Sequence, residues 1–491
     1  MRLWLFRKSA LQRSHEGNTR VVRSKQDEWL VLGWKLSGSN PKWWLGHTHY
    51  DLPAPDAEVV MVEPLSIAQH TAVLAMSGSG KSFFLGRFLE EVITKTRCKC
   101  VVFDPNADFR RIDSVDTEIW NKPVFKENAV PQRPLPHETD GEAYREEWGR
   151  HVKRIIQRSD SEDVDPPFER LKLRLADING DFLAADLPSQ MLGEMNYAHE
   201  FLVEVDRFLK KGKKDLLTVG ERLFRLARTV TATDFVTLAD SDLADASPAQ
   251  IQHIYNTPRY VSETSERAYF GAIRRLIAQG MIGLQNGMAN MTDANVRLRI
   301  IDLPSIPTHA DQLLASHALL NAEWRRAKQE WADAIAANGV DKRVPTLLVL
   351  DEAHNLAPRD PLSPSAKNML DQVRTIVAEG RKFGLFAVLV SQRPDKLDPI
   401  VLSECENVAL MRLSNAETLE NARDLLNLKI DGHVTQDLLT LGKGQVHIFG
   451  KWSSDPRGEA FLCAARRTFQ GGANLRPEYW AVPEPKRDDS K

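Results

Sequence analysis

The sequence is poor in cysteine, in long apolar runs and in net charge, and each scarcity narrows what the protein can be. Four cysteines occur among 491 residues, at positions 98, 100, 405 and 463. Cys98 and Cys100 are too close together for the usual zinc knuckle, which favours reduced, packed thiols over a metal site and indicates the cytoplasm. No run of about 18 apolar residues is present, so the sequence predicts no membrane span.

The charges of the chain almost cancel, because 65 Lys and Arg stand against 67 Asp and Glu. With a formal net charge of −2, no overall basic field attracts nucleic acid. Any DNA contact must therefore come from local basic patches, such as the lining of a ring. Tandem repeats and low-complexity tracts are also lacking, and the 42% hydrophobic content supports a sizeable core.

The strongest motif lies between residues 71 and 94. An apolar run at 71–75 leads into Ala-Met-Ser-Gly-Ser-Gly-Lys-Ser at 75–82, and a helical pattern follows. This order of strand, phosphate loop and helix is typical of a nucleoside triphosphate site. Small residues allow backbone N–H groups to surround the phosphates, and the first turn of the helix adds its own free N–H groups.

We assign nucleotide binding to six consecutive residues of this loop: Ser77, Gly78, Ser79, Gly80, Lys81 and Ser82. Lys81 would carry its charge to the β- and γ-phosphate oxygens, and the Ser82 hydroxyl would ligate Mg²⁺. The usual pattern opens with glycine, and here that position is Ala75. Because the Gly-Ser-Gly-Lys-Ser core is intact, we interpret this change as tolerated.

Two further apolar runs end in acidic residues. The run at 345–350 ends in Asp351 and Glu352, which we expect to complete the Mg²⁺ shell and to polarise the attacking water, respectively. The alternative is an acidic strand end that caps the next helix. The run at 98–103 ends in Asp104, which would hold Mg²⁺ through water or only shape its loop.

A third apolar run, at 385–391, ends in Gln392 and Arg393. Gln392 at that strand tip would sense the γ-phosphate. Charge develops on the phosphoryl oxygens during transfer, so catalysis favours a nearby arginine. Arg381 and Arg393 are the candidates and Arg412 is a weaker third, with one of them acting on a neighbouring subunit. The alternative for each is an ordinary ion-pair arginine.

The pattern of the chain changes several times, which predicts five segments: a small β-rich N-terminal region at 1–58, the first part of the nucleotide-binding core at 59–117, a mostly helical insertion at 118–292, the second part of the core at 293–470 and a C-terminal arm at 471–491. In the first segment Trp43 and Trp44 would fill a small core or stack on bases.

The insertion is expected to contain helices at 142–158, 189–211, 219–230 and 262–279, and a strand with a tight turn at 171–185. It also carries a basic run at 210–214, followed by Arg222, Arg225 and Arg228. These cations would meet DNA phosphates or form a solvated helix end.

Three segments of the second half, at 378–384, 391–394 and 402–407, resemble the HerA branch of the HerA/FtsK phosphate-loop ATPases. The loop at 78–82, Asp104-Pro105, Asp351-Glu352 and the run at 442–446 stand in the order that this family shows. The resemblance covers residues 59–117 and 296–462. It implies a RecA-like α/β fold with a mainly parallel sheet, use of ATP and Mg²⁺, and a hexameric motor that moves double-stranded DNA with a nuclease or phage-defence effector as partner.

Two departures from the family stand out: no N-terminal β-barrel is recognisable in the first 60 residues, and Ala75 replaces the loop glycine. Three alternatives to a DNA motor also remain. They are an ATP-gated scaffold that regulates a partner effector, a conjugation-type ATPase, and a superfamily-two helicase suggested by the letters Asp-Glu-Ala-His at 351–354. A single phosphate-loop domain argues against the last, so we interpret His354 as a polar residue beside a helix, with a coupling role as the alternative.

Overall fold

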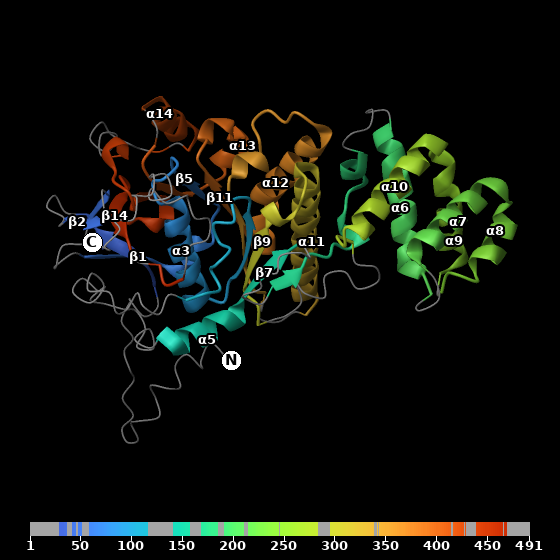
Figure 1. The fold of residues 1–491 in the computed structure, drawn as a ribbon, viewed down its shortest axis with the longest axis horizontal. Coiled ribbons are helices and arrows are strands. Elements are labelled where there is room, and N and C mark those ends of the chain that lie inside the picture. Colours follow the sequence, from blue (N-terminus) through green and yellow to red (C-terminus); the bar gives the residue numbers. More distant parts are fainter. Residues whose placement is uncertain are drawn as a thin grey trace, which may run out of the picture.

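A computed structural model describes most of the chain outside its two ends. The described residues are 29–36, 42–45, 48–51, 58–115, 141–157, 168–184, 191–210, 215–244, 246–282, 295–337, 341, 343–413, 416–426, 428, 438–464 and 466–468. Within them, a twelve-stranded sheet has the order β4-β1-β14-β13-β12-β5-β11-β10-β6-β9-β7-β8 (Figure 1). A separate two-stranded sheet pairs β2 (Lys42–Leu45) with β3 (Thr48–Asp51).

Eight neighbouring strands of the large sheet run parallel: β12 (Asn407–Leu410), β5 (Thr71–Leu74), β11 (Leu385–Ser391), β10 (Thr346–Leu350), β6 (Lys99–Asp104), β9 (Leu298–Asp302), β7 (Val152–Ile156) and β8 (Phe168–Arg170). The other four are antiparallel: β13 (Gln445–Phe449), β14 (Glu459–Cys463), β1 (Leu30–Lys35) and β4 (Val59–Val62). Both faces are buried along the central strands β5, β11 and β10, as their continuous apolar runs require. The predicted α/β fold with a mainly parallel sheet is confirmed.

Helices cover the two faces of the sheet. Helix α3 (Lys81–Lys95) packs on one face, where alternate sheet residues such as Val349 and Val388 join its core. Helices α11 (His309–Ala336) and α12 (Pro364–Phe383) cover the opposite face. Helix α3 matches the helical pattern predicted after the phosphate loop. The side chains of Thr308 and Ser363 cap the N-termini of α11 and α12 by accepting backbone N–H groups.

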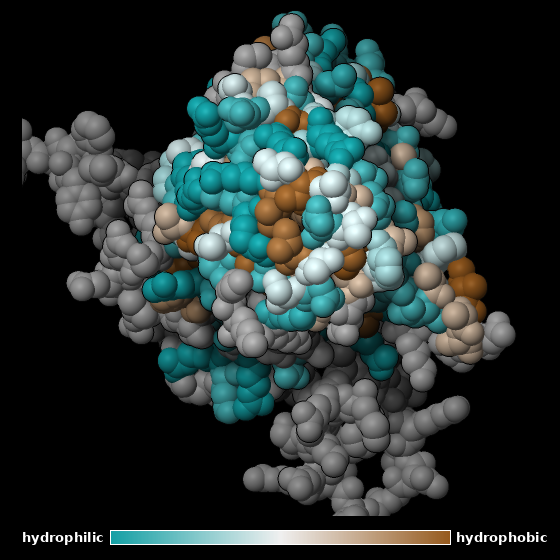
Figure 2. Space-filling view, turned by 90° about the vertical axis from the view of Figure 1, so that its right-hand side faces the viewer, coloured by the Kyte–Doolittle hydropathy of each residue, from teal (hydrophilic) through white to brown (hydrophobic). Residues whose placement is uncertain are grey.

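A helical subdomain projects beyond α11 at one end of the molecule (Figure 1). It contains α6 (Leu192–Phe208), α7 (Leu216–Thr229), α8 (Ala232–Ala239), α9 (Pro248–Asn256) and α10 (Glu263–Ala278). Phe224 stacks edge-on against Phe201 and Phe270, so this subdomain has aromatic packing of its own. Its outer face is mainly hydrophilic around a small apolar area (Figure 2).

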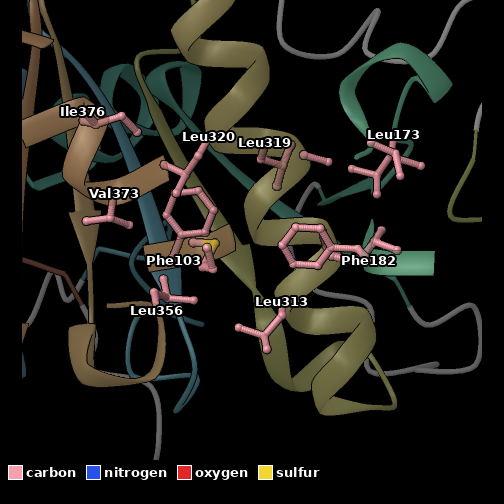
Figure 3. Packing of buried hydrophobic residues seen from close by; sticks show 14 of the residues in the cluster. Phe103, Leu173, Phe182, Leu313, Leu319, Leu320, Leu356, Val373 and Ile376 are labelled. Carbon is pink, nitrogen blue, oxygen red and sulfur yellow. The ribbon is translucent and has the colours of Figure 1, made fainter. Parts of the chain in front are cut away.

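Helix α11 also joins the sheet to the helical subdomain. On one side Leu320 lies toward Phe103 of β6, and on the other Leu319 lies toward Phe182 (Figure 3). Phe182 belongs to the short 3₁₀ helix η6 (Gly180–Ala184), which also contacts α6. One continuous hydrophobic core therefore connects the helical subdomain to the layer of α11 and α12 that covers the sheet.

Two predicted elements of the insertion are wrong. The sequence predicts a helix at 142–158, but α5 (Gly141–His151) ends seven residues earlier. The next residues form the mostly buried strand β7, which pairs with β9 and extends the sheet. The strand and turn predicted at 171–185 are replaced by η5 (Leu175–Asp177) and η6, with an isolated bridge between Leu173 and Ile282. In both places, pairing and packing with distant segments override the local pattern.

The division into five segments stays a prediction. Strand β1, from the predicted N-terminal region, pairs with β14 and β4 in the main sheet. Trp43 and Trp44 lie on β2, but their side chains are outside the described part of the structure. Two short helices, α13 (Pro399–Ser403) and α14 (Ala416–Leu425), complete the second half. None of the described helices is long and apolar enough to cross a bilayer.

Glycine 86 provides a test of how α3 packs. A Cβ atom at this position would lie 2.5 Å from Nε of Arg466, a side chain that is 2% exposed. We expect Gly86→Ala to lower the free energy of unfolding by about 1–3 kcal/mol, because neither group can move away. The matched control is Gly271→Ala in α10, where nothing lies within 4 Å and the helix should gain about 0.5–1 kcal/mol. Equal denaturation midpoints for the two variants would contradict this packing.

Candidate nucleotide site

The phosphate loop connects β5 to α3 at the carboxyl edge of the parallel strands. Gly78 and Gly80 have φ angles of 77° and 104°, which favour glycine. The loop is fastened on two sides, since the Met76 N–H donates to the Arg412 carbonyl at 2.8 Å and the Ser79 carbonyl accepts from the Gly444 N–H at 2.8 Å. Ala75, which stands where the usual pattern has glycine, is buried, and its N–H donates to the Ser391 carbonyl at 3.2 Å.

Lys81 brings the two predicted acidic residues together. Its Nζ lies 2.6 Å from Oδ1 of Asp351 and 2.6 Å from Oε1 of Glu352. Burial opposes the charge of Lys81, but the two carboxylates outweigh it and raise the lysine pKa above its ordinary value. The three residues are at most 6% exposed, so this is a buried ion-pair cluster.

One carboxylate oxygen of the acidic pair is available to bind a cation. Oδ2 of the buried Asp351 has no hydrogen-bond partner among the described residues, which is costly unless a ligand completes it. This orphan oxygen and the Ser82 hydroxyl are donors that suit Mg²⁺. Nowhere in the described part of the chain do three or more His, Cys, Asp or Glu side chains form a metal-binding group. Mg²⁺ commonly binds to one or two protein ligands together with nucleotide phosphates, and Ser82 and Asp351 would supply two such ligands.

Glu352 has strained backbone geometry and a second polar neighbour. Its φ and ψ angles are 47° and 50°, a left-handed conformation that is uncommon for a residue with a side chain. The Gln392 Nε2 donates to Glu352 Oε1 at 2.5 Å, beside the bond from Lys81. His354 Nδ1 lies 3.5 Å from the other carboxylate oxygen and 3.2 Å from the Ser391 hydroxyl. The predicted base and sensor residues are therefore in contact.

Asp104 has the contacts of a loop-shaping residue. Its carboxylate accepts the backbone N–H groups of Asn106, Asp108 and Phe109 at 3.2, 3.1 and 2.9 Å. Burial raises its pKa to about 7, which the hydrogen bonds to its charged form only partly offset. Of the two predicted roles, these contacts favour loop shaping.

The raised pKa of Asp104 predicts a pH-dependent stability. Because the folded-state pKa of about 7 lies well above the ordinary pKa of an aspartate, the folded protein binds more protons than the unfolded chain between these two values. The free energy of unfolding should therefore fall as pH rises from 4 to 7. Asp104→Asn loses this titration and also one acceptor. The wild type should lose stability between pH 5 and pH 8, whereas the variant should not. The difference in free energy of unfolding between the two proteins should therefore decrease by about 3 kcal/mol over this range, in denaturant titrations with EDTA. A pH-independent difference would refute the raised pKa.

The candidate arginines lie at opposite edges of the sheet. Arg393 follows β11 and Arg412 follows β12, and both are exposed at the carboxyl edge without an ion pair to any residue that the structure describes. Arg381 is near the end of α12, before β11 begins, and pairs with Glu406. The seven-residue strand β11 therefore puts about 20 Å between Arg381 and Gln392. Within one chain, Arg381 is not part of the cluster around Lys81.

The basic residues of the insertion are largely paired. Arg222 contacts Asp242, and Arg225 and Arg228 lie 3.7 and 2.6 Å from Glu266. The Lys210 Nζ donates to the Asp240 carbonyl. The remainder of the predicted basic run, residues 211–214, lies outside the described residues. The four cysteines are free and buried.

Sequence reasoning missed two contributors to the site. Asp108 accepts a hydrogen bond from the Ser82 hydroxyl at 2.5 Å, and Arg466, which follows β14, lies over Gly86 and near the Ser82 carbonyl. The run Asp-Pro-Asn-Ala-Asp at 104–108 contained a signal for the first, since a second carboxylate follows the strand end. No local pattern indicated Arg466, because it is brought to α3 only by the folding of the last strands.

A glycine loop between a parallel strand and a helix, with its lysine facing an Asp-Glu pair at a neighbouring strand end, defines the phosphate-loop nucleoside triphosphatases. A family model described as "Helicase HerA, central domain" matches residues 59–322, more than half of the chain, and the protein therefore belongs to this family. The resemblance to the HerA branch is thus confirmed, and the conjugation-type alternative is not favoured.

Two curated relatives are a probable helicase, MJECL08, of Methanocaldococcus jannaschii, 23% identical over 406 residues, and the DNA double-strand break repair helicase HerA of Pyrococcus furiosus, 20% identical over 393 residues. Each alignment covers 78% of this chain but only 64% and 63% of the relative, respectively. Among solved structures, the conjugative coupling protein TrwBdeltaN70 has a TM-score of 0.43 at 13% identity, covering 85% of this chain and 90% of its own. VirB4 of Thermoanaerobacter pseudethanolicus has a TM-score of 0.44 at 14% identity, covering 88% and 98%.

Proposed function

We propose that the protein is an ATP-hydrolysing motor that assembles into a ring, a hexamer, and translocates double-stranded DNA. The observation that supports this proposal most strongly is the contact cluster of Lys81, Asp351, Glu352 and Gln392, which come from three separate segments of the chain. Burying these charges costs desolvation energy that their mutual attraction does not reliably repay, so a ligand-binding role accounts for the cluster better than stability does. The preference for ATP over GTP rests on the family resemblance alone.

The chemistry follows from the positions of these side chains. Backbone N–H groups of the loop bind the phosphates, and Lys81 moves from the carboxylates toward the β- and γ-phosphate oxygens. Release from Lys81 leaves Glu352 free to accept a proton from the attacking water. When bound by Ser82 and Asp351, Mg²⁺ neutralises charge on the phosphates. Gln392, which contacts Glu352, senses whether the γ-phosphate is present.

An arginine from a neighbouring protomer would complete the site. Arg393 and Arg412 are exposed near the phosphate loop, whereas Arg381 would have to act from the opposite edge of another subunit's sheet. An added cation stabilises the charge that develops on the transferred phosphoryl group. A DNA substrate is supported by the names of the relatives, which are helicases. The hexameric ring rests on the family resemblance. A nuclease or defence effector as partner rests on the family resemblance.

Ring assembly and DNA movement can be tested together. Mass photometry with Mg·ATP should detect a hexamer, and the protein should displace a triplex-forming strand from duplex DNA in an ATP-dependent manner. ATP hydrolysis is then measured in mixtures of wild-type subunits with Arg393→Ala or Arg412→Ala subunits. The variant that lowers hydrolysis by the wild-type subunits beside it identifies the arginine that acts on a neighbour. A chain that stays monomeric and displaces no strand would refute the motor.

An ATP-gated scaffold for an effector is the second candidate function. The internal ion pairs of Arg222, Arg225 and Arg228 favour it, because they remove the most evident basic patch from DNA binding. In a scaffold, ATP binding rather than cleavage is the output. Glu352→Gln should then still assemble and activate the partner, whereas a motor with this substitution should stall.

A further inference from the structure

The hydroxyl of the predicted metal ligand Ser82 already has a dedicated acceptor. Its Oγ donates to Oδ2 of Asp108 at 2.5 Å. Ser82 lies in the first turn of α3, which follows β5. Asp108 lies in the loop that follows β6, and the strands β11 and β10 lie between β5 and β6 in the sheet. A charged acceptor at this distance makes a short, strong hydrogen bond. The orientation of the hydroxyl is therefore fixed before any cation binds.

The loop that carries Asp108 is held rigidly. Asp104 accepts three of its backbone N–H groups, as described above. Ala107, immediately before Asp108, has a φ angle of 57°, a left-handed conformation that costs free energy for a residue other than glycine. Phe109 is fully buried, and the Arg466 guanidinium lies 5.7 Å from the centre of its ring. The surrounding contacts thus maintain a strained backbone that directs the Asp108 carboxylate to Ser82.

We propose that Asp108 is the positioning residue of the magnesium site, an inference that rests on the proposed function. A hydroxyl has one hydrogen and two lone pairs, so donation to Asp108 leaves both lone pairs of Ser82 Oγ for the cation. The negative charge of Asp108 also increases the basicity of that oxygen, as carboxylates behind metal ligands commonly do. Asp351, whose pKa is raised mainly by burial and further by the charges of Glu352 and Asp108, contributes the orphan oxygen to the same site.

The test measures magnesium-linked nucleotide binding rather than turnover. A fluorescent ADP is titrated with the full-length protein in EDTA, and the complex is then titrated with Mg²⁺. We expect Asp108→Ala to leave the metal-free affinity unchanged and to weaken the apparent Mg²⁺ affinity by about 10- to 100-fold. Asn106→Ala is the matched control, since it changes an exposed side chain of the same loop and should bind Mg²⁺ as the wild type does.

A double-mutant cycle makes the test specific to the Ser82–Asp108 contact. Ser82→Ala should cause a similar loss of Mg²⁺ affinity, and the double variant should lose no more than Ser82→Ala alone. Asp108→Asn, which keeps an acceptor without the charge, should fall between Asp108→Ala and the wild type. Unchanged Mg²⁺ affinity in Asp108→Ala, an equal loss in EDTA, or fully additive losses would each overturn the inference. If the wild type itself shows no Mg²⁺-linked binding, the proposed function fails as well, and the two failures are thereby distinguished.

Discussion

Replacing Lys81 by methionine will destabilise the nucleotide-free protein in addition to abolishing nucleotide turnover. The ammonium group is the partner of two buried carboxylates at 2.6 Å each, and its removal leaves their charge without compensation. Breaking a buried pair in this way costs about 3–5 kcal/mol. The loss should appear in denaturant titrations at neutral pH without nucleotide. It should decrease at acidic pH as Asp351, whose pKa is raised by burial, becomes protonated.

The control for this variant is Lys367→Met, which removes an exposed lysine of α12. Its free energy of unfolding should stay within about 0.5 kcal/mol of the wild type. A Lys81→Met protein as stable as the wild type would show that the ion-pair cluster does not exist in the nucleotide-free state. In that case the conclusion that Lys81 must leave the carboxylates when ATP binds would be wrong.

Replacing Glu352 by glutamine will separate nucleotide binding from cleavage. The amide is similar in shape and keeps an acceptor for Lys81, but it cannot take a proton from water. Loss of a general base reduces turnover by about 100- to 10,000-fold, so single-turnover ATP cleavage should slow by that factor. The equilibrium affinity for Mg·ATP should be retained or increased, because no phosphate contact is removed.

The matched control is Glu404→Gln, an exposed carboxylate at the end of α13, which should cleave ATP at the wild-type rate. Cleavage by Glu352→Gln at a rate close to that of the wild type would exclude Glu352 as the base. Joint loss of binding and cleavage would instead mean that the strained backbone at this position, with φ of 47°, depends on the glutamate side chain.

The sequence was sufficient to predict how the central strands bring the site together. The apolar runs before Lys81, Asp351 and Gln392 are fully buried strands, and parallel strands align their carboxyl ends at one edge. A motif at each strand end therefore predicts a contact, as between Lys81 and Asp351. The long helices were equally predictable, because their apolar positions recur at helical spacing.

Other parts of the structure depend on contacts that local patterns do not encode. Residues 152–156 continue a helical pattern but lie next to the open edge of β9, where pairing stabilises a strand. Arg381 belongs to the family-like run at 378–384, but it precedes β11 in the chain. It therefore lies at the amino edge of the parallel strands, away from the phosphate loop. Asp108 reaches Ser82 only through the unusual conformation of Ala107, which no residue preference would indicate.

Phosphate release from Mg·ATP by the purified wild-type chain is the measurement that tests the central claim most directly. If the cluster around Lys81 cleaves ATP to drive a DNA motor, phosphate is released, EDTA abolishes the release and duplex DNA accelerates it. ATP that stays intact under every condition, including with duplex DNA and a co-purified partner present, would contradict the account.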